Sequence, residues 1–242
     1  MADDVRQQNV TRRDTPPGTY SDGALGYGRG NRYGEEVVVP LDRNTLSDEG
    51  SYYVATNPTP GTAIVGIAAA DGYDDTEALL TISNDHASKH VYLDYLHLVA
   101  KVAGSSGTDF AYAIDMATEA TYASGGSAIT PVDVNRETNN TAPVTMYFGA
   151  VVTTTGTTEK IVSHGQLLTV IKVIGDHFLF TFGGEGLPPA TAIMEGVAQH
   201  SVQRSCPPIV IPPGHALSFR DFATSQASAG AQYQFELGFW VR

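Results

Sequence analysis

The stretch of sequence that decides the fold is AQYQFELGFWV, residues 231–241. Its large apolar side chains fall on one parity: Tyr233, Phe235, Leu237, Phe239 and Val241. The other parity carries Gln232, Gln234, Glu236, Gly238 and Trp240. A period of two places these sets on opposite faces of a sheet, so the stretch predicts a strand whose first face belongs to the core. Trp240 on the second face indicates that this face is covered as well.

Strand patterns recur through most of the chain from residue 62 onward. We expect strands at residues 64–70, 77–84, 90–102, 110–116, 144–152, 161–174, 178–182, 209–211 and 216–222. Residues 161–174 form either one bent strand or two, with Gly165 at the bend. The turn sequences GSSG (104–107) and SGGS (124–127) should interrupt the chain. Only residues 116–122 and 190–199 could hold short helical pieces. Many strands separated by such turns predict an all-β, jelly-roll-like β-sandwich.

The N-terminal part of the chain has a different character. Residues 1–34 contain eight glycines and prolines and show no apolar period. The segment EVVVP (36–40) could form a short edge strand that ends at its proline. The turn NPTPG (57–61) marks a natural boundary. The sequence therefore predicts an extended N-terminal arm over residues 1–60 and a sandwich body over residues 61–242.

The arm admits two interpretations. It is either a disordered tail or a segment that becomes ordered on a neighbouring subunit, and its isolated tyrosines favour the second because they can act as anchors. The candidate partner-binding residues are Arg12, Arg13, Tyr20, Tyr27, Arg29, Arg32 and Tyr33.

Charge and hydropathy limit the kinds of partner that this chain can bind. The formal net charge is −12, and an acidic body repels the phosphates of nucleic acid. No stretch approaches the roughly 20 apolar residues of a membrane span. Residues 1–15 do not resemble a signal peptide, so we expect synthesis in the cytoplasm. Charged residues make up only 17% of the chain, below the usual proportion of about 25%. Such a composition suits proteins that lie against other proteins, and secreted β proteins share it.

Residues capable of chemistry are scattered. Cys206 is the single cysteine, which rules out an internal disulfide and favours a buried thiol over a catalytic one. His86 and His90 are four apart, but outside a helix this spacing does not bring them to one face. The acidic loop 71–77 could hold Ca²⁺, although a solvated turn is the favoured interpretation. We therefore expect no catalytic, cofactor or metal site.

Residues 207–242 resemble the C-terminal part of structural proteins from tailed bacteriophages. The resemblance rests on PIVIPPG (208–214) and the closing FELGFW (235–240). NPTPGTAI (57–64), followed by TEALLTI (76–82), also resembles phage virion sequences. The resemblance implies a component of the virion. Phage head decoration proteins are often jelly-roll trimers with arms, and this chain fits that description.

These observations predict a non-enzymatic virion protein. The first hypothesis is a capsid decoration, or cement, protein that binds the major capsid protein or other virion proteins through its arm and sandwich edges, as a homotrimer. The alternative is a host-receptor-binding or adaptor module of a tail fibre, spike or baseplate. An enzyme is a third class, for which the sequence offers no constellation of residues.

Overall fold

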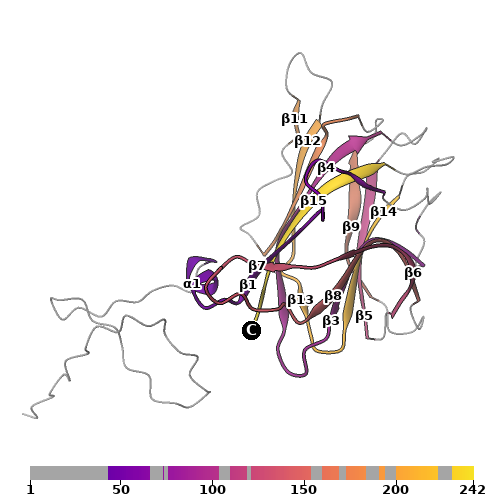
Figure 1. Cartoon of the computed structure of the whole chain (residues 1–242). Coiled ribbons are helices and arrows are strands. Elements are labelled where there is room, and N and C mark those ends of the chain that lie inside the picture. Colours follow the sequence, from indigo (N-terminus) through magenta and orange to yellow (C-terminus); the bar gives the residue numbers. More distant parts are fainter. Residues whose placement is uncertain are drawn as a thin grey trace, which may run out of the picture.

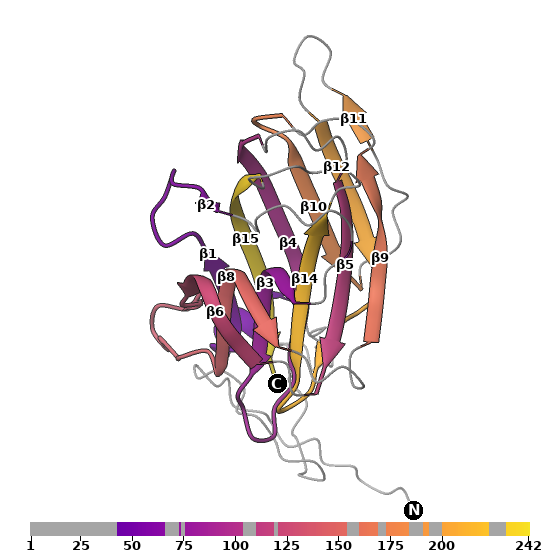
Figure 2. The same cartoon turned by 90° about the vertical axis from the view of Figure 1, so that its right-hand side faces the viewer.

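Two β-sheets packed face to face form the protein, as the sequence predicts (Figures 1 and 2). The computed structural model describes residues 43–65, 73, 76–103, 110–118, 121–153, 160–168, 173–183, 191–193, 200–222 and 231–242. Within these ranges there is one helix, α1 (Arg43–Asp48), which lies beside β1 and β7 in Figure 1. The architecture is an all-β, jelly-roll-like sandwich.

The larger sheet has nine strands in the order β11-β12-β10-β4-β15-β1-β7, with β13 paired to β4 and β2 paired to β15. Its strands are β1 (Tyr52–Thr56), β2 (Ile64–Val65), β4 (Val91–Val102), β7 (Val132–Asp133), β10 (His177–Phe182), β11 (Thr191–Ile193), β12 (His200–Cys206), β13 (Val210–Ile211) and β15 (Gln232–Val241). All pairs are antiparallel except β10 with β12.

The smaller sheet has six antiparallel strands in the order β6-β8-β3-β14-β5-β9. They are β3 (Glu77–Asn84), β5 (Phe110–Ala117), β6 (Thr121–Ile129), β8 (Val144–Thr153), β9 (Lys160–Leu168) and β14 (Ala216–Phe222). Figure 2 shows this sheet in front of β15, β4, β10 and β12.

Strand β15 lies in the interior of the larger sheet. It pairs with β4 along its whole length and with β1 on its other side. The predicted core parity is buried, with Phe235, Leu237 and Phe239 at most 4% exposed. The prediction that this strand helps to build the core is therefore confirmed.

Aromatic rings from both sheets interlock in the core. Phe148 of β8 stacks on Phe235 of β15, with ring centroids 4.7 Å apart. Phe110 of β5 meets Phe178 of β10 at 4.4 Å. Each such side chain contributes roughly 1.5–3 kcal/mol by burial, and aromatic pairing adds about 0.5–1.5 kcal/mol. These contacts hold the two sheets together.

The prediction of a short helical piece at residues 116–122 is wrong, because β5 ends at Ala117 and β6 begins at Thr121. Of residues 190–199, Thr191–Ile193 form β11 and the others lie outside the described residues. Pairing with neighbouring strands outweighs the weak local preference of these sequences. The expected break at 124–127 is also wrong, because β6 runs from Thr121 to Ile129 through Gly125 and Gly126, whose φ values of 74° and 67° suit glycine.

The boundary of the arm also needs correction. Residues 52–56, which the sequence assigns to the arm, form β1 inside the larger sheet. The turn after β1 is held by the buried Asn57, whose side-chain amide donates to the carbonyls of Thr62 (2.9 Å) and Tyr233 (3.2 Å). The NPTPG turn thus links two strands of the body. Residues 1–42, including the candidate strand 36–40, lie outside the described residues.

Candidate partner-binding face

One face of the nine-stranded sheet points away from the sandwich core, and we call it the outer face. On β4, β10 and β15 the buried core residues alternate with more exposed ones, so the strand period assigns the second set to the outer face. This set comprises Tyr92, Tyr95, His97, Val99, His177, Leu179, Gln234, Glu236 and Trp240. The outer face thus combines aromatic rings, imidazoles and few charges.

Trp240 and Tyr92 form a cross-strand aromatic pair on this face. Their ring centroids are 5.5 Å apart and their planes differ by 4°. Both side chains are half-buried. Pairs of this kind stabilise a sheet by roughly 0.2–1 kcal/mol, and they leave a rigid aromatic surface that a partner can cover.

A β-bulge at Gly238 arranges the neighbouring rings. The register between β15 and β4 shifts after the Gly238–Tyr95 pair, so that Phe239 opposes Leu93 and Asp94 has no partner across the strands. A Cβ atom at Gly238 would overlap the hydroxyl of Tyr52 and the ring of Tyr95. The glycine is required here because both tyrosines pack directly on its backbone.

Asp94 ties α1 and β1 to the outer face. The hydroxyl of Tyr52 donates to Asp94 Oδ2 at 2.7 Å, and Arg43 Nη2 donates to Oδ1 at 2.6 Å. Burial raises the pKa of Tyr52 well above its usual range, and the hydrogen bond to Asp94 raises it further. The carboxylate is 4% exposed and is satisfied by these two donors, so it has a structural role.

Next to this group, Tyr95 donates a hydrogen bond to Glu236 Oε1. Burial is the main cause that raises the pKa of Tyr95, and the bond to Glu236 is the next. Glu236 is the cross-strand partner of His97, whose Nε2 lies 3.0 Å from Nδ1 of His177. The outer face therefore carries a continuous polar row from β15 across β4 to β10.

A second polar cluster lies in the smaller sheet. Arg220 Nε donates to Asp115 Oδ2, and Arg220 Nη1 donates to the carbonyl of Glu77 at 2.6 Å. The hydroxyl of Tyr73 donates to the same Asp115 oxygen at 3.2 Å. Arg220 and Asp115 are each 1% exposed. Full burial and mutual pairing make this cluster a structural one.

Cys206 is buried, as predicted, at the β12 edge of the core. Ser163 Oγ lies 3.7 Å from its Sγ and 3.3 Å from the hydroxyl of Tyr112, which accepts a bond from Arg204 Nε at 2.9 Å. Burial raises the pKa of the Cys206 thiol, which keeps it protonated and poorly nucleophilic. The arrangement does not activate the sulfur.

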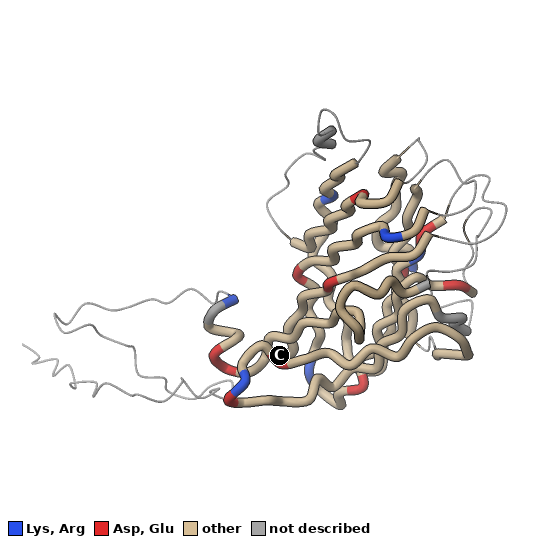
Figure 3. Tube along the Cα trace, turned by 45° about the horizontal axis from the view of Figure 1, so that its top comes forward, with Lys and Arg blue, Asp and Glu red and all other residues tan. Residues whose placement is uncertain are grey.

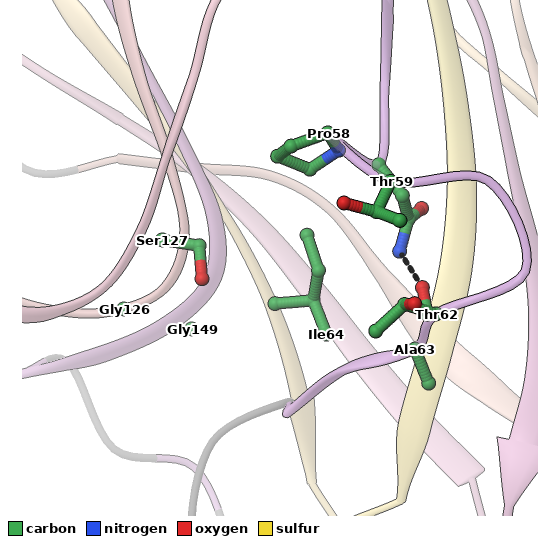
Figure 4. Close-up of a pocket in the computed structure, with 9 residues that line it drawn as sticks. Pro58, Thr59, Thr62, Ala63, Ile64, Gly126, Ser127 and Gly149 are labelled. Carbon is green, nitrogen blue, oxygen red and sulfur yellow. Dashed lines mark hydrogen bonds between the residues drawn. The ribbon is translucent and has the colours of Figure 1, made fainter.

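A shallow pocket of about 490 Å³ lies between the β1–β2 turn and strands β6 and β8 (Figure 4). Its wall consists of Asn57, Pro58, Thr59, Thr62, Ala63, Ile64, Gly126, Ser127 and Gly149. Asn57 is already bonded to backbone groups, and no lining residue carries a charge. The pocket offers hydroxyls and backbone but no acid, base or nucleophile pair.

The candidate arm residues named from the sequence lie outside the described residues. Most of the acidic loop 71–77 does too, although Tyr73 packs with its ring 5.9 Å from the Arg220 guanidinium. His86 holds a local turn, because its Nδ1 accepts from the amides of Ser88 and Lys89. In the described ranges, no three His, Cys, Asp or Glu side chains group so as to hold a metal ion.

No described helix is long and apolar enough to cross a membrane.

Sequence reasoning did not identify the outer face as a site. The one signal was Trp240 on the parity opposite the core, which indicated that a second face is covered. The histidines gave no signal, because His97 and His177 are far apart in sequence.

No family model, no curated protein and no solved structure matches this chain.

Proposed function

We propose that this protein is a non-enzymatic structural component of a tailed-phage virion, and that it is a decoration protein bound to the head lattice. The observation that carries the proposal is the outer face, where half-buried aromatic rings stand on a paired sheet. The virion setting comes from the resemblance of residues 207–242 to phage structural proteins.

The outer face has the composition of a binding surface. Tyrosine and tryptophan are the residues that most often dominate the energetics of protein interfaces, while charged residues are depleted at interface centres. Figure 3 shows Lys, Arg, Asp and Glu sparsely distributed over the body. Tyr92 and Trp240 already hold each other in place, so these two side chains would lose little conformational entropy when a partner covers them.

The charged groups in the body favour a structural role. Asp133 accepts hydrogen bonds from the amides of Asn135 (2.9 Å) and Asn140 (2.8 Å) and from the hydroxyl of Thr138 (2.6 Å). The fully buried Asp176 accepts from the amides of Val173 (2.8 Å) and His200 (2.7 Å). These carboxylates shape loops, and such use of acids is typical of a scaffold.

The proposed partner is the major capsid protein or another virion protein, and the proposed assembly is a homotrimer. We assign the outer face and the arm residues Arg12, Arg13, Tyr20, Tyr27, Arg29, Arg32 and Tyr33 to these contacts. A solution mass equal to one 25.7 kDa chain at micromolar concentration would contradict the trimer.

The decisive experiment is the copy number per purified virion, measured by quantitative gel staining or mass spectrometry. A decoration protein should be present in numbers comparable with the major capsid protein. A handful of copies that fractionate with tails would support the receptor-binding or adaptor module instead, and absence from virions would refute both.

A matched pair of variants tests the face itself. Tyr92→Ala should weaken binding to particles lacking the native copy by roughly tenfold or more, as for an interface hot spot of about 2 kcal/mol. Tyr122→Ala removes a 40% exposed ring from β6 of the other sheet and should leave binding unchanged. Equal binding by both variants and the native chain would show that the outer face is not the contact surface.

A further inference from the structure

Two histidines from different strands meet on the outer face. His97 Nε2 of β4 and His177 Nδ1 of β10 are 3.0 Å apart, while the ring centroids are 5.2 Å apart with planes 19° from parallel. The nitrogens are thus much closer than the centroids, so the rings meet edge to edge along one N–H···N hydrogen bond.

Few other charges face this pair. On β15 the cross-strand partner of His97 is Glu236, which also accepts the bond from Tyr95. On β10 and β12 the neighbours are Leu179, opposite His97, and Ser201, opposite His177. On β4, Lys101 shares the parity of Val99, the partner of His177, and Asp94 is neutralised by Arg43. Glu236 and Lys101 are therefore the unneutralised charges next to the pair among the described residues.

Proton counting shows when this bond can exist. A neutral imidazole has one donor nitrogen and one acceptor nitrogen, whereas an imidazolium has two donors and no acceptor. The bond forms when both rings are neutral, and it strengthens when one ring is charged because the donor is then an ion. When both rings are charged, no acceptor is left and two cations lie side by side.

We propose that the His97–His177 pair is a proton-operated latch on the outer face, closed while either ring keeps a free lone pair and open when both rings are protonated. Opening breaks the side-chain hydrogen bond between β10 and β4, while their backbone pairing remains. Compared with the neutral pair, it adds two positive charges to the outer face.

The surroundings of His97 disfavour the charged form of its ring. Burial lowers the pKa of His97, the neighbouring His177 lowers it further, and Glu236 acts in the opposite direction. His97 therefore takes up its proton at a pH below the ordinary histidine pKa of about 6.5. Stability from the latch is present above that range and is lost as the pH falls through the lowered pKa of His97.

The functional consequence rests on the proposed function. If the outer face binds a virion partner, two added positive charges at its centre should weaken attachment in acid, since interface centres exclude unpaired charge. The latch itself is a property of the isolated chain and can be tested without a partner.

The first test is a proton NMR titration of the full chain that follows the histidine ring signals. We expect the pKa of His97 to be lower in the native chain than in His177→Gln, because the neighbouring imidazole lowers it. His177→Gln should fold, because His177 is exposed. An unchanged pKa of His97 in His177→Gln would overturn the latch.

The second test measures attachment to particles lacking the native copy at about pH 7.5 and about pH 5, on either side of the usual histidine range. The native chain and a His164→Gln control, changed on β9 of the other sheet, should bind several-fold less in acid. The double variant His97→Gln/His177→Gln should bind equally at both values. If nothing binds at either pH, the proposed function fails while the titration still decides the latch. Equal acid loss in the double variant would refute the link between the latch and attachment.

Discussion

Arg220 and Asp115 form a buried ion pair between two strands of the smaller sheet, and each residue has about 1% of its surface exposed. Arg220 lies on β14 and Asp115 on the neighbouring strand β5. Removing one charge of a buried ion pair typically destabilises a protein by about 3–5 kcal/mol.

The first prediction follows from this pair. Asp115→Asn should lower the free energy of unfolding by about 3–5 kcal/mol, as measured by urea denaturation. The double variant Asp115→Leu/Arg220→Met should recover a large part of the loss, because replacing both charges of a buried pair by apolar side chains removes their desolvation cost. A single variant as stable as the native chain would show that the pair is solvated in solution.

The second prediction concerns the bulge at Gly238. Gly238→Ala introduces a Cβ atom that overlaps the hydroxyl of Tyr52 and the ring of Tyr95, so we expect the free energy of unfolding to fall by about 1–3 kcal/mol, as for overpacking. Adding Tyr95→Ala should make the combined loss smaller than the sum of the two single losses. Strict additivity in urea denaturation would mean that the glycine does not support the packing of Tyr95.

The third prediction concerns the core face of β15. Truncation of Phe235, Leu237 or Phe239 to alanine should cost roughly 2–5 kcal/mol each, because every one leaves a cavity between the sheets. Gln234→Ala, on the outer parity of the same strand, is the matched control and should change stability by less than about 0.5 kcal/mol. Losses below about 1 kcal/mol at all three core sites would contradict their burial.

The fourth prediction is a loss of stability at high pH. Burial raises the pKa of Tyr233, whose hydroxyl donates to Asp221 at 3.1 Å, and burial also raises the pKa of Tyr52 and Tyr95. The stability from these neutral hydroxyls is present below the ordinary tyrosine pKa near about 10 and is lost as the pH rises beyond it.

The measurement is alkaline unfolding followed by circular dichroism together with the ultraviolet absorbance of tyrosinate. Ionisation of the buried tyrosines should coincide with unfolding, and Tyr233→Phe should make the transition less steep. Tyr122→Phe, at an exposed ring, is the control and should leave the steepness unchanged. Full ionisation of all tyrosines in a chain that remains folded would count against the prediction.

The fifth prediction separates the arm from the fold. Deleting residues 1–40 should leave the melting temperature nearly unchanged and strongly weaken attachment to particles lacking the native copy. The physical reason is that ordering an extended segment costs roughly 1–2 kcal/mol per residue, which contacts on another subunit must offset. A much lower melting temperature would place the arm within the fold, and normal melting with native affinity would show that the arm is not a binding element.

The sequence by itself determined the strands of the core. Period-two patterns predicted β5 and β15 within a residue or so of their observed bounds, because a strand between a core and a second face alternates. β3 and β14 were predicted at their observed bounds from short strand-like stretches that do not alternate. The class of fold followed from the number of such strands. The sequence did not predict β12 or β1. β12 carries few apolar residues, and β1 lies directly before the NPTPG turn, which marked the boundary of the arm.

Only the tertiary structure decided which polar groups meet. His97 and His177, 80 positions apart, are brought together by the pairing of β4 with β10. Asp115 and Arg220, 105 positions apart, are brought together by the pairing of β5 with β14. No local pattern encodes these contacts, because strand order arises from the burial of whole faces. The sequence thus determined which residues face the core, whereas the register between distant strands decided what the outer face can do.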